Sequence, residues 1–472
     1  MINTWKKNYS AVPRTLDRLK NLGGVASVFN ANIDAIVQVN SDRFHNWHNS
    51  LSKPLAQSKD LARKIESPED VLQGLLNGFK NGIAQEWLVT DKAAFEWLQE
   101  KIGYDKLQMG GQGGIISNVM TITGVQKVYV HTASHESRQA SLFLDDERLL
   151  ASNGKELLPA KNIEREGDIP LMHWILEFKK GQTLILNGEE ITCPKSNRFI
   201  ATYDPLNFDL HLDQAFSRAL KSKDLALDVV LMSGFHMLGE KLSNGRLGID
   251  QLQSVWQEVK SWKASHPDVM IHLEFASTQN LTIRQAIAEK VAHEVDSIGL
   301  NEQELIDILE IIHLKDLACS CRSAMNAPTL FDGTLEVFKH FDPYRCQLHM
   351  FGIYLTLTRE TDRTKLLAMR DGMALAATLA ATKAGTGSLE NKDQLLHGHG
   401  QDIWGPAVQE MKSLNAHLTQ LGVGDEQFLE SGIVIMAEYS IVALPTILVE
   451  KPVSLVGMGD TISSLSLVGS LV

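Results

Sequence analysis

At 472 residues, the chain is long enough for a large domain and a second, smaller one. Its 44% hydrophobic and 22% charged residues are ordinary for a globular protein, so nearly the whole chain is expected to fold. A formal charge of −12 and a pI near 5.7 argue against a nucleic-acid partner, which would need clustered Lys and Arg.

The chain has no run of about 18 apolar residues, and Met1–Lys7 lacks the apolar core of a signal peptide. A cytoplasmic protein with no membrane partner is therefore expected. The cysteines are too few and too irregularly spaced for a disulfide framework. The residues predicted to be reduced thiols are Cys193, Cys319, Cys321 and Cys346.

Short apolar runs that end in polar residues and precede helix-like stretches indicate the buried parallel strands of an α/β fold. Ligands of such sheets lie beyond the carboxyl ends of the strands, so the polar residues after each run are candidate site residues. The predicted strands are Val25–Phe29, Asp228–Ser233, Val269–Phe275, Ser297–Leu300, Leu348–Leu357 and Ile433–Ala437.

The first of these runs ends in Asn30-Ala31-Asn32-Ile33-Asp34. Asn and Asp at a strand end often only form a turn, but their amides and carboxylates also suit a polyhydroxylated ligand. The glycine-rich segment Met109–Ile115 would let the backbone approach such a ligand closely, although a glycine run alone is a weak signal.

The middle of the N-terminal half is predicted to be helical and polar over residues 41–108, with a helix that begins near Ser67-Pro68. From about Val125 to Asp204, apolar and polar residues alternate, which predicts an inserted β-sheet. Such a sheet is suited to be a lid over a site that must exclude water.

In the predicted strand Val269–Phe275, the two-residue period places His272 and Glu274 on one face. Polar groups in a buried strand must be paired or must coordinate something. Glu274 is therefore a candidate Mg²⁺ ligand, through water, with His272 orienting it. A zinc site is the alternative, but no third ligand lies at suitable spacing.

The segment Asn301-Glu302-Gln303-Glu304 follows the next predicted strand and opens a helix. A capping box explains it well, with Asn301 as the N-cap and Glu304 as its reciprocal partner. In the functional alternative, Asn301 contacts a phosphate and Glu304 holds the water shell of Mg²⁺.

Near the C-terminus, Val453–Ser463 predicts a strand, a glycine turn and a helix that begins at Asp460-Thr461. The N–H groups of a first helical turn bind anions, which suits a transferring phosphoryl group. Asp460 would then accept the proton of the attacking hydroxyl, as carboxylates do in kinases. An ordinary Asp at a helix start is the equally supported alternative.

Together and in this order, the segments resemble the ADP-dependent glucokinase and phosphofructokinase family, a branch of the ribokinase-like superfamily found mainly in archaea. The resemblance extends over most of the chain. It rests on Asn30-Ala31-Asn32-Ile33-Asp34, Gly110-Gly111-Gln112, His173–Phe178, Asn197–Ile200, His272-x-Glu274, Asn301-x-x-Glu304 and Gly457-x-Gly459-Asp460.

The resemblance implies a three-layer α/β/α large domain with a smaller β-sheet lid domain. The large domain would comprise residues 1–33, 53–124 and 205–472, and the lid residues 34–52 and 125–204. The expected partners are ADP and a sugar or sugar phosphate, and the protein is expected to be a monomer or a small homo-oligomer.

The resemblance also implies transfer of the β-phosphoryl group of ADP to a sugar, leaving AMP, with Mg²⁺ or another divalent cation as cofactor. Asp460 would be the general base, with Gly457 and Gly459 at the phosphoryl group. The metal would be arranged by Glu274, Glu304 and Asp460. The nucleotide would lie near Asn301, His349, Met350, Leu448 and Val449. The sugar would face Asn32, Asp34, Gly110, Gly111, Gln112 and His173.

The family more usually has a hydroxyl residue at the position of Met350, so only a backbone contact is expected there. Glu86 resembles the family's glucose determinant, a carboxylate that accepts hydrogen bonds from sugar hydroxyls. Lys179-Lys180 resembles the phosphofructokinase branch, because cations neutralise a sugar phosphate; a solvated hairpin turn is the alternative. Arg198 would serve the phosphate of the sugar or those of the nucleotide.

Fructose 6-phosphate is the predicted main acceptor, giving fructose 1,6-bisphosphate, because a charge-assisted phosphate contact adds more than one neutral hydroxyl contact. Glucose is the predicted second acceptor, and a glucokinase is the first alternative. Two other classes stay open. A catalytically inactive sugar or nucleotide sensor would need neither Asp460 nor Glu304, and a metal-dependent hydrolase would use His272 and Glu274.

Overall fold

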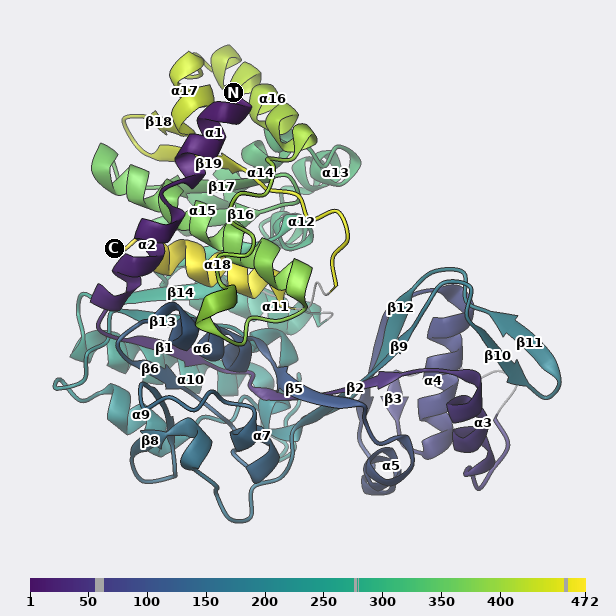
Figure 1. Ribbon diagram of the computed structural model, residues 1–472. Helices are drawn as coiled ribbons and strands as arrows, with labels where there is room; N and C mark the ends of the chain where they lie inside the picture. Colours follow the sequence, from purple (N-terminus) through teal and green to yellow (C-terminus); the bar gives the residue numbers. More distant parts are fainter. Residues whose placement is uncertain (56–62, 276–277, 279, 454–456) are drawn as a thin grey trace.

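The computed structural model describes residues 1–55, 63–275, 278, 280–453 and 457–472. They form a large lobe and a small lobe, each built on its own β-sheet, and both chain termini lie in the large lobe (Figure 1). No helix within these ranges is long and apolar enough to cross a membrane. The four cysteines are free, as predicted.

An eleven-stranded sheet forms the centre of the large lobe. Its middle strands, from β7 to β16 in spatial order, run parallel and are buried except at Leu150 and Met270, because helices cover both faces. The spatial order is β18 (Ile433–Ile435), β19 (Ser440–Pro445), β17 (Ile353–Thr358), β16 (Arg345–His349), β15 (Ser297–Leu300), β14 (Met270–Glu274), β13 (Val229–Met232), β1 (Val25–Val28), β6 (Val128–Val130), β7 (Leu149–Ser152) and β8 (Leu157–Pro159).

The helices of the large lobe bury their apolar faces against this sheet or against one another. They are α1 (Ile2–Tyr9), α2 (Val12–Arg18), α6 (Gln112–Thr123), α7 (Ser137–Ser141), α8 (Pro205–Phe208), α9 (Gln214–Leu220), α10 (Gly248–Ser265), α11 (Leu281–Ile287), α12 (Glu302–Ile311), α13 (Lys315–Ser323), α14 (Ala327–Phe341), α15 (Arg363–Thr386), α16 (Gly405–Gln420), α17 (Glu426–Ser431) and α18 (Met458–Gly469).

A six-stranded sheet forms the small lobe, in the order β3 (Lys64–Ile65), β4 (Gln85–Val89), β12 (Asn197–Tyr203), β9 (Met172–Phe178), β2 (Asn32–Gln38) and β5 (Lys106–Gly110). Its apolar face packs in a core of its own with the small-lobe helices. These are α3 (Ser41–Asn49), α4 (Pro68–Asn81) and α5 (Lys92–Trp97), and the hairpin β10 (Thr183–Leu186) and β11 (Glu189–Thr192) extends the lobe. The other face of the sheet carries polar side chains.

Two of the crossings between the sheets lie where β1 leads into β2 and where β5 leads into α6 (Figure 1). At the first crossing Phe29 and Asn30 have φ values of 68° and 54°, a left-handed conformation that is uncommon for residues other than Gly. Polar residues at such crossings lie beside both lobes at once, which is where a ligand held between two sheets must bind.

The predicted domain boundaries are wrong in two places. Strands β3, β4 and β5 fall within residues 53–124 but pair in the small sheet, and β6, β7 and β8 fall within residues 125–204 but pair in the large one. The alternation of apolar and polar residues predicts a strand but does not predict the sheet to which the strand belongs. That choice depends on distant partners, since β4 pairs with β12 and β6 pairs with β1.

Most predicted strands agree with the structure, but Leu348–Leu357 is not one strand. It contains the end of β16, a turn at Gly352 and most of the antiparallel β17; the φ of 111° at Gly352 permits the reversal. The helix start at Ser67 is confirmed. Helix α18 begins at Met458, two residues before the predicted start, and residues 454–456 of the predicted strand lie outside the described residues.

Candidate active site

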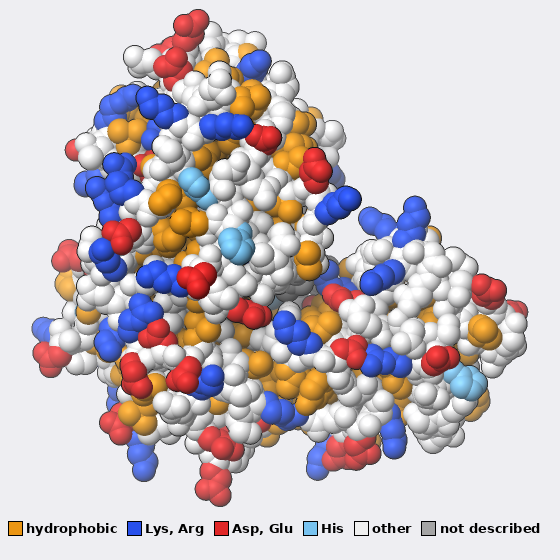
Figure 2. Space-filling model, viewed as in Figure 1, with side chains coloured by type: hydrophobic (Ala, Val, Ile, Leu, Met, Phe, Trp, Pro, Cys, Tyr) orange, Lys and Arg blue, Asp and Glu red, His pale blue; other side chains and the backbone are white. Residues whose placement is uncertain are grey.

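A cleft of about 360 Å³ lies between the lobes, and the surface is hollowed there in Figure 2. Strands of the small sheet line one side, and the first turns of α6 and α18 line the other. The predicted site residues that it brings together are Asn32, Asp34, Glu86, Gly111, Gln112, His173, Arg198, Gly457 and Asp460.

Asp460 lies in the first turn of α18, directly after the left-handed N-cap Gly457, whose φ is 62°. Gln112 connects it to the rest of the large lobe: its Nε2 donates to Asp460 Oδ1, and its Oε1 accepts from the N–H of Gly234 at 3.0 Å. Burial raises the pKa of Asp460 to about 6, although Lys383 and Gln112 lower it. The carboxylate is therefore suited to accept a proton near neutral pH.

Lys383, which sequence reasoning missed, lies behind the same turn. It belongs to α15, is 7% exposed, and donates to the carbonyl oxygen of Gly457 at 3.1 Å. Burial lowers its pKa to about 8, against the opposite effect of Asp460 and Asp34. The signal in the sequence is a single charge within Ala380-Ala381-Thr382-Lys383-Ala384, an otherwise small and uncharged stretch of a buried helix.

Beneath the first turn of α18, Glu274 lies between two imidazoles, as the strand period predicted for His272. His272 Nε2 is 3.4 Å from Glu274 Oε2, and His349 Nε2 is 3.5 Å from Glu274 Oε1. Burial lowers the pKa of both histidines, to about 4 for His349, which favours the neutral form of each imidazole. Burial, followed by the charges of Glu304 and Asp460, raises the pKa of Glu274 well above its usual value.

The capping box predicted at Asn301 is present. The Asn301 side chain accepts from the N–H groups of Gln303 and Glu304, and Glu304 Oε2 accepts from the N–H of Asn301 at 2.8 Å. Glu304 is buried and close enough to Glu274 to raise its pKa. The cap thus also fixes a second carboxylate beside Glu274.

On the cleft face of the small sheet, alternation aligns polar side chains from neighbouring strands. Asp34 of β2 is paired with His173 of β9, and Glu86 of β4 lies beside β12, which also carries Arg198. Asn32 Nδ2 donates to Asp34 Oδ1 at 3.2 Å. These groups offer both hydroxyl acceptors and one cation to a ligand.

The electrostatics of this face favour a protonated histidine. Burial lowers the pKa of His173, but its hydrogen bond to Asp204 at 3.1 Å and the charges of Glu86 and Asp34 outweigh that effect and raise it. Burial raises the pKa of Asp34, with His173 acting against it. Thr202 Oγ1 donates to Glu86 Oε1 at 2.6 Å, which aims that carboxylate along the strand face.

The glycines of the predicted loop allow the β5–α6 connection to pack directly against the β1–β2 connection. A Cβ at Gly110 would lie 2.1 Å from Asp34 Oδ1, and one at Gly111 would lie 2.1 Å from the carbonyl oxygen of Asn30. Gly111 also has a left-handed φ of 69°. Neither position can hold a larger residue without moving the polar groups of the cleft.

The residues predicted for the nucleotide lie together on the large lobe. His349 and Met350 are buried at the end of β16, and Leu448 and Val449 are half-buried. The two segments are joined where the N–H of Thr446 donates to the carbonyl oxygen of Gly352 at 2.9 Å. None of these four residues lines the cleft itself. A Cβ at Gly459 would lie 3.0 Å from His349 Nε2, so His349 lies directly beside the first turn of α18.

The two predicted phosphate-binding lysines are not in the cleft lining. Lys179 and Lys180 are exposed in the turn after β9, and their N–H groups donate to Gln182 Oε1 and Ser196 Oγ, both at 2.9 Å. Their backbone is thus that of an ordered hairpin turn. Arg198 of β12, in contrast, lines the cleft.

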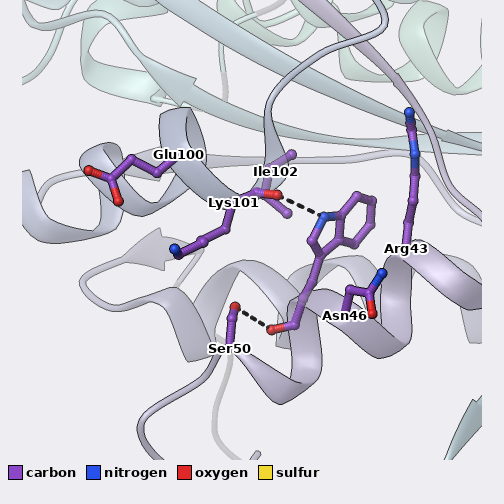
Figure 3. A pocket seen from close by; sticks show the side chains of 7 residues that line it. Arg43, Asn46, Ser50, Glu100, Lys101 and Ile102 are labelled. Carbon is purple, nitrogen blue, oxygen red and sulfur yellow. Dashed lines mark hydrogen bonds between the residues drawn. The ribbon is translucent and has the colours of Figure 1, made fainter.

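A second hollow, of about 300 Å³, lies in the small lobe and contains no predicted site residue (Figure 3). Its polar groups bind one another: Trp47 Nε1 donates to the carbonyl oxygen of Lys101 at 3.1 Å, and Ser50 Oγ donates to that of Trp47 at 2.7 Å. Arg43, at its edge, pairs with Asp105. These contacts hold α3 against the segment Leu98–Ile102.

Comparison with known proteins decides the family. The model of the "ADP-specific Phosphofructokinase/Glucokinase conserved region" matches residues 23–469. The chain belongs to this family. This family member is 28% identical to the ADP-specific phosphofructokinase of Methanosarcina acetivorans, over 100% of this chain and 98% of the relative. It is 29% identical to the ADP-dependent glucose/glucosamine kinase of Pyrococcus abyssi, over 98% and 97%.

Solved structures agree with this assignment. The last common ancestor of ADP-dependent phosphofructokinases from Methanosarcinales matches with a TM-score of 0.87 and 28% identity, over 100% of this family member and 99% of the ancestor. An ADP-dependent kinase in complex with fructose 6-phosphate and ADPβS matches with a TM-score of 0.83 and 28% identity, over 100% and 98%. The family resemblance and the ribokinase-like α/β fold are confirmed.

Proposed function

We propose that this kinase transfers the β-phosphoryl group of ADP to fructose 6-phosphate, forming fructose 1,6-bisphosphate and AMP, and that it also phosphorylates glucose. The observation that carries the proposal is that one cleft joins Asp460 to the polar face of the small sheet with its cation, Arg198. Membership of the family and a relative solved with fructose 6-phosphate and ADPβS support it.

In the proposed reaction, the sugar hydroxyl attacks the β-phosphorus in line, and Asp460 takes its proton. The backbone amides from Gly457 to Gly459 receive the charge that develops on the phosphoryl oxygens. Closure of the lobes would exclude water, which otherwise competes as an acceptor. Gln112 supports this role because its bond to Asp460 holds the carboxylate at the cleft.

A divalent cation such as Mg²⁺ fits the residues below this turn. Glu274 is a buried carboxylate whose two imidazole neighbours lie no closer than 3.4 Å, and a metal-bound water would satisfy its remaining lone pairs. Within the described residues, no three His, Cys, Asp or Glu groups are close enough to bind a metal directly, so Glu274, Glu304 and Asp460 would hold it largely through water. When bound, the ion would neutralise phosphate charge.

The adenosine part of ADP is proposed to extend from the first turn of α18 toward His349 and Met350, with Leu448 and Val449 on its apolar side. Asn301 is proposed to lie near a phosphate. Asn301 and Met350 follow the carboxyl ends of the parallel strands β15 and β16, where ligands of such sheets bind.

The two acceptors depend on different groups of the small lobe. Arg198 suits the phosphate of fructose 6-phosphate, and Lys179 and Lys180 add positive charge nearby. Glu86 favours glucose as a second acceptor, because Thr202 holds its carboxylate on the face where sugar hydroxyls would bind. A predominantly glucokinase activity is the second candidate on this observation.

Steady-state phosphorylation tests the proposal, with ADP or ATP as donor and fructose 6-phosphate or glucose as acceptor, in the presence of Mg²⁺. Turnover with ADP and fructose 6-phosphate is expected, with a slower reaction on glucose. A preference for glucose would favour the second candidate. Turnover only with ATP would contradict the donor, and none with any pair would indicate a sugar or nucleotide sensor.

A further inference from the structure

Lys383 is a buried cation to which the proposed reaction assigns no role. It lies near the end of α15, the long helix that packs along α18, and it reaches the first turn of α18 although it does not line the cleft. Most buried lysines are paired, because an ammonium group is strongly hydrated in water. The hydrogen-bond partners of Lys383 therefore indicate the role of its buried ammonium group.

The contacts of Lys383 all converge on one turn. Its Nζ donates to the carbonyl oxygen of Gly457 at 3.1 Å and to Thr461 Oγ1 at 3.3 Å, and Thr461 Oγ1 donates to the same carbonyl at 2.7 Å. Gly457 is the left-handed N-cap of α18, so this closed set of bonds fixes the direction in which the first-turn amides point.

Among the described residues, Lys383 has no partner of opposite charge in direct contact. The two groups that accept its hydrogen bonds, the Gly457 carbonyl and the Thr461 hydroxyl, are both neutral oxygens. The positive end of the α18 dipole also opposes a cation here. Asp460 and Asp34 act on it only from the cleft. An anion bound at the first turn of α18 would supply the missing charge.

We infer that Lys383 is a positioning residue for phosphoryl transfer: it holds the Gly457–Thr461 turn and places a fixed positive charge behind the amides that receive the β-phosphoryl group of ADP. The inference rests on the proposed function. It implies that Lys383 favours ADP over AMP, because only ADP carries the β-phosphate. A lysine that merely filled space in the core would not affect this preference.

The test replaces Lys383 in the full chain and compares nucleotides. In Lys383→Met the apolar stem stays and the charge is lost. Calorimetry with Mg²⁺ should show ADP affinity reduced about tenfold and AMP affinity changed less than about twofold. The kcat should fall about 10- to 100-fold, since a displaced first turn misaligns the reacting groups. Lys365→Met is the matched control, because Lys365 lies on the same helix, is exposed and pairs with Glu360.

The outcomes separate this inference from the proposed function. Absence of turnover in the unaltered protein would contradict the proposed function. If the unaltered protein is active, an unchanged ADP-to-AMP affinity ratio in Lys383→Met would overturn the inference, and so would an equal loss for both nucleotides, which marks a purely structural role. If thermal unfolding shows that Lys383→Met does not fold, Lys383→Gln replaces it with the same expected loss, because it keeps a donor for Gly457 but no charge.

Discussion

On the large-lobe side of the cleft Asp460 and Lys383 are held by partners, whereas on the small-lobe side two charged groups, Arg198 and Glu86, project from the strand face beside the buried Asp34. Asp460 is half-buried and bound by Gln112, and the buried Lys383 lies behind the same turn. Arg198 and Glu86 are exposed, and Thr202 is the side chain that binds Glu86. Side chains held by partners suit the chemical step, which needs fixed geometry. Exposed groups on the sheet can be substituted to change the preferred sugar without disturbing that step.

The largest effect is expected on the enclosed side. Asp460→Asn keeps the shape of the base but cannot accept a proton, so kcat should fall about 10²–10⁴-fold with both sugars. Steady-state kinetics measure the loss, and calorimetry should show that sugar and ADP still bind. Asp402→Asn, which changes an exposed carboxylate, is the control. A kcat within about threefold of the unaltered value would remove Asp460 from the role.

On the open side, Arg198→Ala should separate the two acceptors. Removing a charge-assisted hydrogen bond costs about 1.5–3 kcal/mol, so kcat/KM for fructose 6-phosphate should fall about 10- to 100-fold. The value for glucose should change less than about threefold, because glucose has no phosphate.

The controls for Arg198 are the exposed cations of the neighbouring turn. The double variant Lys179→Ala, Lys180→Ala should lower kcat/KM for fructose 6-phosphate only about two- to threefold, through long-range attraction that salt screens. An equal loss for Arg198→Ala with glucose and fructose 6-phosphate would contradict a phosphate contact. A larger loss from the lysines than from Arg198 would assign the phosphate to the turn instead.

The pH dependence of the rate tests the large-lobe side, because Asp460 is the proposed base and must be ionised to act. Burial raises the pKa of Asp460 to about 6, and the base acts in its ionised form, so activity should be lost as pH falls through this value. With glucose, which does not titrate in this range, kcat/KM at pH 5 should be about tenfold below its plateau.

Asp460→Asn is the control for this profile, because its residual rate should lack the acidic limb. Arg198→Ala should retain the limb unchanged, since the guanidinium does not titrate in this range. A rate that stays level from pH 5 to 8 in the unaltered protein would contradict the role of a buried carboxylate in the chemical step.

For Glu86 the expected effect is smaller than for Asp460 or Arg198. Glu86→Ala should lower kcat/KM for glucose about tenfold, because a carboxylate that accepts hydroxyl hydrogen bonds is lost. Activity with fructose 6-phosphate should be kept or should rise, since a negative charge near the sugar phosphate is removed. Glu190→Ala, an exposed carboxylate on the β10–β11 hairpin, is the control. Equal changes with both sugars would show that Glu86 does not discriminate between them.

Much of the site was predictable because its parts are local. The pairing of His272 and Glu274 on one face follows from the strand period, and the capping box at Asn301 follows from residues three positions apart. The glycine turn before Asp460 is likewise complete within one short segment. The fold class followed from the order of apolar runs, although the turn at Gly352 divided one of them.

The sequence by itself determined the α/β class, the polar strand ends, the glycine turn before Asp460 and the capping box at Asn301, because these features depend on short-range geometry. Only the tertiary structure decided which strands join which sheet, that Gln112 binds a carboxylate 348 positions away, and that Lys383 reaches a carbonyl 74 positions away. These contacts depend on how the packed lobes meet. No periodicity or spacing along the chain encodes how the lobes pack, so these long-range partners became visible only in the folded protein.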